Sequence, residues 1–128
     1  MKLTKVKYPI TNPLVFAIVM KDAELCRELI ERILPGRKIS KIRFPEPPSS
    51  ETEKTIIPGL YAKSVRLDVL FEDGESWNDI EMQVLKQSYL PLRGRYYHAA
   101  MDINQLHAGA DYPELRPTYV IFICTFDY

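Results

Sequence analysis

Residues 65–84 read VRLDVLFEDGESWNDIEMQV, and this stretch carries the clearest structural pattern of the chain. Apolar and polar residues alternate in residues 65–71 and again in residues 76–84, which is the pattern of strands that bury one face. Between the two runs stands Asp73-Gly74, a strong signal for a two-residue hairpin loop. The stretch therefore predicts an antiparallel β-hairpin.

The alternation also assigns each side chain of the hairpin to a face. One face is apolar, and its members are Val65, Leu67, Val69 and Phe71 from the first strand and Ile80, Met82 and Val84 from the second. The opposite face is polar and carries Arg66, Asp68, Asp79, Glu81 and Gln83. A one-residue slip would move Glu81 onto the apolar face, so the hydrophobic pattern opposes it.

Two registers satisfy this pattern. If residues 73–74 form the loop, Asp68 pairs with Asp79, whereas if residues 74–75 form it, Asp68 faces Glu81 directly. In either register, carboxylates converge on one face of the sheet. A hard divalent cation is held in this way, by a few oxygen ligands with positions left open for water and phosphate. Acids on the solvent-exposed face of a hairpin are more often simply hydrated. The rest of the sequence therefore has to decide between hydration and cation binding.

The rest of the chain contributes helices and strands on either side of the hairpin. Asn12-Pro13 is a helix entry, with a capping side chain followed by proline in the first turn. Before the hairpin, the sequence predicts a helix over residues 12–34 that is interrupted and recapped at 21–22, a strand at 38–44 and a proline-rich loop at 45–59. After the hairpin it predicts a helix at 91–107 and a strand at 118–126 that is buried on both faces. The apolar residues along one side of the later helix are Leu92, Tyr96, Ala99, Ile103 and Leu106.

Composition describes a small globular protein. Of 128 residues, 46% are hydrophobic, and 17 basic residues balance 17 acidic ones, so any contact with DNA must rely on a local patch. The chain has no apolar run of membrane-spanning length, and residues 1–9 lack the apolar segment of a signal peptide. We therefore expect a cytoplasmic protein without a membrane partner, in which Cys26 and Cys124 are free thiols in apolar surroundings.

Five stretches of the chain resemble the PD-(D/E)xK nuclease superfamily, and most closely its bacterial branch of PD-(D/E)xK family transposases, or recombination-promoting nucleases. They run in family order, at residues 65–69, 79–83, 90–97, 109–115 and 119–126. The resemblance implies an α/β fold with a restriction-endonuclease-like core, in which helices flank a mixed central sheet in the order αβββαβ. It also implies one nuclease core domain over residues 1–128. Relatives continue past the last strand, whereas this chain stops at Tyr128. A truncated gene, a trimmed chain and a minimal catalytic core would each explain this difference.

The resemblance also implies a site. Asp68 would be the motif aspartate, Glu81 the motif acid, and Gln83 would stand where the superfamily usually has lysine, which makes these three the candidate catalytic residues. Asp68, Glu81 and the backbone carbonyl of Met82 would hold Mg²⁺ or Mn²⁺. Gln83 is neutral, but its amide donates and accepts hydrogen bonds and so could orient water or phosphate.

Arginines near the motif are the candidate DNA contacts. The positive charge that Gln83 lacks could come from Arg66 on the polar face, or from Arg93 or Arg95 in the following helix. The same arginines could bind phosphates. The plainer alternative leaves these arginines solvated.

The start of the first helix departs from the branch. Acidic residues are usual there, and this chain has Asn12-Pro13. If a carboxylate from that helix belongs to the metal site, the site is incomplete unless Glu24 or Glu28 substitutes.

The sequence therefore predicts a metal-dependent DNA endonuclease associated with transposition or recombination, with DNA as its partner. The alternative is a degenerate or truncated nuclease-fold domain that acts as a non-catalytic DNA-binding or self-association module, and an α/β fold with an unrelated binding role comes third. A homodimer would suit the nuclease because cutting both strands of a duplex takes two sites, although no residue pattern points to one.

Overall fold

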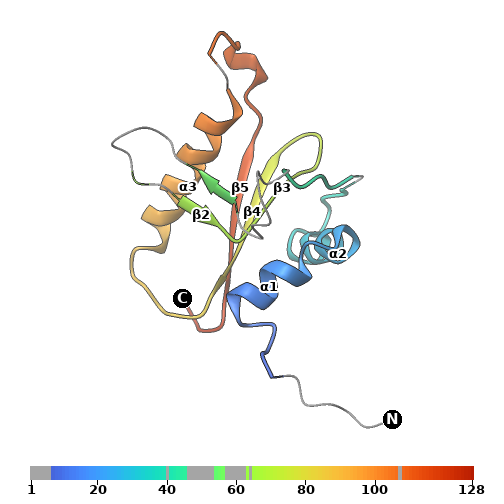
Figure 1. Ribbon diagram of the computed structural model, residues 1–128, viewed down its shortest axis with the longest axis vertical. Coiled ribbons are helices and arrows are strands. Elements are labelled where there is room, and N and C mark those ends of the chain that lie inside the picture. The colour runs from blue at the N-terminus through green and yellow to red at the C-terminus, as the bar shows by residue number, and fades with distance from the viewer. Residues whose placement is uncertain (1–6, 40, 46–53, 57–62, 64, 107) are drawn as a thin grey trace.

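The computed structural model describes residues 7–39, 41–45, 54–56, 63, 65–106 and 108–128, and Figure 1 shows its helices and strands. In chain order the elements are α1 (Pro13–Val19), α2 (Ala23–Ile33), β1 (Lys54–Ile56), β2 (Val65–Leu67), β3 (Val69–Glu72), β4 (Trp77–Gln83), α3 (Leu90–Gln105), the short 3₁₀ helix η1 (Tyr112–Glu114) and β5 (Thr118–Cys124).

The central sheet is mixed and has the strand order β3-β4-β5. β3 and β4 form the antiparallel hairpin, and β5 runs parallel to β4 on its other side. β1 and β2 make a separate two-stranded antiparallel sheet. Helices α1 and α2 lie on one side of the central sheet and α3 on the other (Figure 1). The α/β class and the mixed sheet flanked by helices, as in a restriction-endonuclease-like core, are therefore confirmed.

Helices α1 and α2 begin at the two capping residues that the sequence predicts. The Asn12 side chain accepts hydrogen bonds from the backbone N–H groups of Leu14 and Val15 at 3.0 and 3.2 Å. Asp22 caps α2 in the same way, with distances of 3.0 and 3.1 Å. Each cap satisfies N–H groups that have no partner within the helix, so the predicted run divides into two helices.

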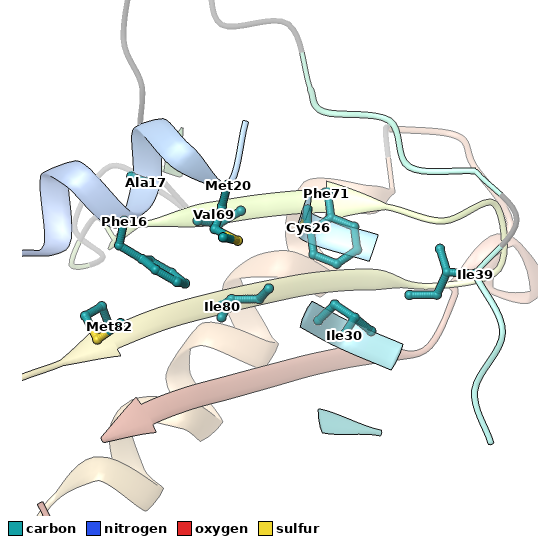
Figure 2. Packing of buried hydrophobic residues seen from close by; sticks show 10 residues of the cluster. All are labelled: Phe16, Ala17, Met20, Cys26, Ile30, Ile39, Val69, Phe71, Ile80 and Met82. Carbon is teal, nitrogen blue, oxygen red and sulfur yellow. The ribbon is translucent and has the colours of Figure 1, made fainter. Parts of the chain in front are cut away.

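A first core fills the space between α1, α2 and the sheet (Figure 2). Helix side chains meet strand side chains there, and the buried members are Phe16, Ala17, Met20, Cys26, Ile30, Ile39, Val69, Phe71, Ile80 and Met82. Burial raises the pKa of the Cys26 thiol to about 12, which keeps it protonated and unreactive. The apolar face that the sequence predicts for the centre of β4 is confirmed by Ile80 and Met82.

Asp68 interrupts the first strand of the hairpin and reverses its faces. β2 ends at Leu67 and β3 begins at Val69. Val65 and Leu67 pack with Leu70 beneath α3, whereas Val69 packs toward α1 and α2. The prediction of one continuous apolar face is therefore wrong for this strand, because the chain bends at Asp68.

The β3–β4 hairpin adopts the second of the two predicted registers. Its ladder pairs Val69 with Ile80, so the next position along places Asp68 opposite Glu81. The turn uses a φ of +89° at Gly74, which glycine reaches without steric cost. The two motif acids are consequently direct cross-strand neighbours.

Two further strands differ from the predictions. Within residues 41–45 the structure has one isolated bridge, in which Arg43 and Glu72 exchange backbone hydrogen bonds of 2.9 Å, and β1 lies instead in the stretch predicted as a loop. β5 sends side chains to both faces, as predicted, but Tyr119 is exposed and the others are only half-buried. The prediction of full burial is wrong because, among the described strands, β5 pairs only with β4 and so lies at the edge of the sheet.

Helix α3 does not bury the stripe that the sequence suggested. Four of its members, Leu92, Tyr96, Ala99 and Ile103, are exposed, and the buried residues are Leu90, Gly94, Tyr97, Ala100 and Met101. Gly94 lies close to β5, because an added Cβ there would be in ordinary contact with the Phe122 ring at 3.5 Å. The helix therefore packs closely on β5 through this side.

Candidate active site

Asp68 and Glu81 hold each other in place across the hairpin. The backbone N–H of Asp68 donates to Glu81 Oε1 at 3.0 Å, and the backbone N–H of Met82 donates to Asp68 Oδ2 at 3.1 Å. The regular ladder between β3 and β4 stops at the Val69–Ile80 pair, so these carboxylates replace ladder carbonyls as acceptors. The bend at Asp68 thus gives each acid a backbone partner on the opposite strand.

Gln83 lies at the end of β4 with both ends of its amide engaged. Its Nε2 donates to the backbone carbonyl of Leu85, and its Oε1 accepts from Arg93 Nη1 at 2.8 Å. The side chain is buried, so these two partners fix which way the amide points.

Arg93, in the first turn of α3, brings a positive charge to this site. Its Nε donates to Tyr97 Oη at 2.8 Å, its Nη1 donates to Gln83, and its Nη2 lies 3.4 Å from Glu81 Oε2. The guanidinium carbon also lies 5.2 Å from the ring centroids of both Tyr97 and Phe122. A planar fork of donors can serve all of these partners at once, which an ammonium cannot do.

The three arginines predicted to contact DNA are not equivalent. Arg66 is exposed in β2 and, together with Arg93, lines a pocket of about 520 Å³. Arg95 is exposed on α3 and is not among the described residues that line this pocket. The structure therefore brings Arg66 and Arg93 together and leaves Arg95 apart.

Asp79 is a third acid near Glu81 on β4, and it is not among the site residues that the sequence predicts. It is fully buried, and neither of its carboxylate oxygens accepts a hydrogen bond from the described residues. Burial and then the charge of Glu81 raise the pKa of Asp79 well above its ordinary value. The signal in the sequence was its spacing of two residues from Glu81 on a strand, which puts both side chains on one face.

Glu81 ionises near neutral pH. Burial and the charge of Asp68 raise its pKa to about 7, against the opposing effects of Asp79, the Asp68 N–H and Arg93. A second positive charge beside Glu81 would favour the ionised carboxylate further.

The donor set fits a hard divalent cation. Asp68 and Glu81 present carboxylate oxygens across the hairpin, and Asp79 adds two buried oxygens that no described donor satisfies. The N–H and C=O of a strand residue point to the same neighbour, so the Met82 carbonyl lies on the Asp68 side of β4. In the part of the chain that the structure describes, no three His, Cys, Asp or Glu side chains form a closed metal cluster. Mg²⁺, however, is usually bound through one or two carboxylates and keeps several waters.

The start of α1 lies beside this end of β4. Asn12 and Pro13 line a pocket of about 510 Å³ together with Met82 and Gln83. The helix start where the sequence led us to expect an acid is therefore close to the candidate site, but the side chain there is an amide that caps the helix.

Glu24 and Glu28 do not supply the missing first-helix acid. Both lie on α2 in exposed ion pairs, Glu24 with Arg27 and Glu28 with Arg32 at 2.6 Å. Their carboxylates are thus engaged on the surface of the helix, away from the acids of the hairpin.

Comparison with known proteins identifies the family. The family model of the PD-(D/E)XK nuclease family transposases matches residues 14–128. No curated protein and no solved structure matches the chain. None of the described helices combines the length and apolar character needed to cross a membrane.

Proposed function

The chain belongs to the PD-(D/E)XK nuclease family transposases, and from this premise we propose that it is a metal-dependent DNA endonuclease associated with transposition or recombination. Membership supports a nuclease-type function with DNA as the substrate, and nucleases of this kind generally use divalent metals. The metal dependence of this chain, its reaction and its site residues are the proposal.

The observation that carries the proposal is the cross-strand pair of Asp68 and Glu81. Each carboxylate accepts a backbone N–H from the opposite strand, so both are positioned without any ligand. Asp68, Glu81 and the Met82 carbonyl would hold Mg²⁺ or Mn²⁺. Such an ion supplies activation of water and neutralisation of charge at the phosphate.

The neighbouring polar residues would orient the substrate. Gln83 cannot supply the charge of the usual lysine, but Arg93 donates to it and reaches Glu81, which puts a permanent cation at the motif position. Arg93 and Arg66 line one pocket and would bind phosphates of the DNA, with Arg95 a further contact along α3.

Plasmid cleavage tests this function. Wild type is compared with Asp68→Asn and Glu81→Gln over a titration of Mg²⁺ and then Mn²⁺, with Asp127→Asn, a change of an exposed acid, as the matched control. We expect cutting that requires metal, is retained in the control and falls by at least about a hundredfold in both site variants. Cutting that survives in both variants would place the chemistry elsewhere.

One observation favours the second candidate, a non-catalytic DNA-binding or self-association module. Asn12 lies next to the end of β4, at the start of the first helix, where the sequence led us to expect an acid. A folded wild type that binds DNA but cuts it with neither metal would support this alternative. A homodimer and a cytoplasmic location stay predictions, and sedimentation of the purified protein tests the first of them.

A further inference from the structure

Helix α3 leaves an apolar stripe in water. Leu92 is 59% exposed, and Tyr96 lies one turn further along the same side. Tyr89, the residue before the helix, is 50% exposed. Large apolar side chains that gather on one surface usually mark a binding site, so this stripe calls for an occupant.

The first part of the stripe lines a pocket with three cations. Tyr89, Leu92 and Tyr96 form its apolar part, and Lys63, Arg66 and Arg93 are its charged residues. The Tyr96 hydroxyl donates to the backbone carbonyl of Lys63 at 2.8 Å, which ties Lys63 to the helix. The volume of about 520 Å³ lies within the range of ligand sites.

The charge of this pocket selects among occupants. None of its described lining residues is acidic, and Lys63, Arg66 and Arg93 make it basic, although Glu81 behind it partly offsets the charge of Arg93. A second copy of the chain on a two-fold axis would bring these cations against their own equivalents, which is unfavourable. An anionic ligand with a flat apolar part is complementary, and a nucleotide has both a phosphate and a base that stacks on aromatic rings.

The position of the pocket connects it to the candidate site. Arg93 lines the pocket and also donates to Gln83 and approaches Glu81. Arg93 would thus contact both a nucleotide held there and the proposed catalytic carboxylate of Glu81.

We propose that this pocket binds an unpaired nucleotide of the DNA, with its base on Tyr89 and Leu92 and its phosphates on Lys63, Arg66 and Arg93. Within a duplex the faces of a base are covered by its stacked neighbours, so a base reaches an aromatic surface only when it is unpaired or flipped out. The inference rests on the proposed function and specifies its substrate as DNA with single-stranded character near the cut, such as a single strand, a flap or a mismatch.

Binding measured without cleavage tests this inference. Fluorescence anisotropy in EDTA compares a short single-stranded DNA, the same sequence as a blunt duplex, and the single strand as RNA. The variants are Tyr89→Ala, Tyr89→Phe and Leu92→Ala, and Tyr112→Ala is the matched control because Tyr112 is 86% exposed in η1. Tyr89 precedes α3 without making a side-chain capping hydrogen bond, so its truncation leaves the helix intact.

We expect Tyr89→Ala to weaken binding of the single-stranded DNA about tenfold, with a smaller loss for Leu92→Ala, and Tyr89→Phe and Tyr112→Ala to bind as wild type does. The blunt duplex should bind more weakly than the single strand and respond less to these changes. Unchanged affinity in both Tyr89→Ala and Leu92→Ala overturns the inference, as does tighter binding of the RNA than of the DNA by wild type. A change in oligomeric state on sedimentation, with DNA binding intact, would assign the stripe to a second copy of the chain instead. Loss of cutting alone, with this binding pattern retained, would count against the nuclease and not against the pocket.

Discussion

The backbone N–H of Asp68 lies 3.0 Å from Glu81 Oε1, so the main chain of one hairpin strand positions the carboxylate of the other. The relationship is reciprocal, because Met82 donates its N–H to Asp68. The bend that takes Asp68 out of the ladder also makes these contacts.

Removing the charge of Asp68 should separate cation binding from folding. In Asp68→Asn the amide oxygen can still accept the Met82 N–H, so we expect Tm to stay within a few degrees of wild type while Mn²⁺ affinity, measured by titration calorimetry, falls at least about tenfold. In Asp68→Ala the acceptor is lost too, which should cost a further ~1 kcal/mol of folding free energy. Equal Mn²⁺ affinity in wild type and Asp68→Asn would remove Asp68 from the cation site.

Cation binding should strengthen as the pH rises through about 7. Burial and Asp68 raise the pKa of Glu81 to about 7, so below this pH a cation has to displace a proton from the carboxyl group. We expect Mn²⁺ affinity to increase about tenfold between pH 6 and pH 8, with proton release visible as a buffer-dependent heat. Glu81→Gln should abolish the proton release, and a wild type without it would contradict the assignment.

Without metal, Glu81 should lower stability at alkaline pH. Its pKa is higher in the folded state than the ordinary 4.5, so the folded state binds the proton more tightly between pH 4.5 and 7. That stabilisation is complete below the unfolded pKa and is lost as the pH rises through about 7. In EDTA at pH 8 we therefore expect Glu81→Gln to unfold several degrees above wild type, on the order of 2 kcal/mol, whereas Glu75→Gln in the exposed loop should change little. A lower Tm for Glu81→Gln would show that its contact with the Asp68 N–H outweighs the buried charge.

Cleavage should require the planar guanidinium of Arg93, and not only its positive charge. Arg93→Lys keeps one positive charge but cannot serve Gln83, Tyr97 and Glu81 together. We expect cleavage at saturating metal to fall about tenfold or more, and Arg32→Lys, at an exposed position on α2, to behave as wild type. Full activity of Arg93→Lys would mean that a point charge is sufficient at this position.

Two glycines should respond oppositely to alanine. Gly94→Ala adds a Cβ in ordinary contact with Phe122 and improves helix propensity, so it should be neutral or stabilising by up to ~1 kcal/mol in chemical denaturation. Gly74→Ala places a side chain at a φ of +89° and should destabilise by ~1 kcal/mol or more. The same sign for both would contradict the backbone argument.

Sequence periodicity was sufficient to predict the hairpin but not to predict which side of α3 is buried. Residues 65–84 offer one apolar and one polar face, so slipping by one residue is penalised and few registers remain. α3 has apolar residues on both sides, and there the period alone cannot choose which side is buried. Packing against β5 made that choice, and it placed Tyr97 in the core beside Phe122 and Tyr96 at the surface.

The sequence alone was enough for the α/β class, through the alternation of the hairpin strands, and for the family, through the resemblance of five stretches of the chain. The roles of Asp68, Glu81 and Gln83 follow from that resemblance and stay a prediction. The tertiary structure decided which register brings Asp68 opposite Glu81, that Arg93 and not Arg95 reaches the site, and that the buried acid Asp79 lies beside Glu81. These relationships join α3 to the sheet or depend on how deeply a side chain is buried. Such long-range packing sets local charge and pKa, and no short segment of sequence contains it.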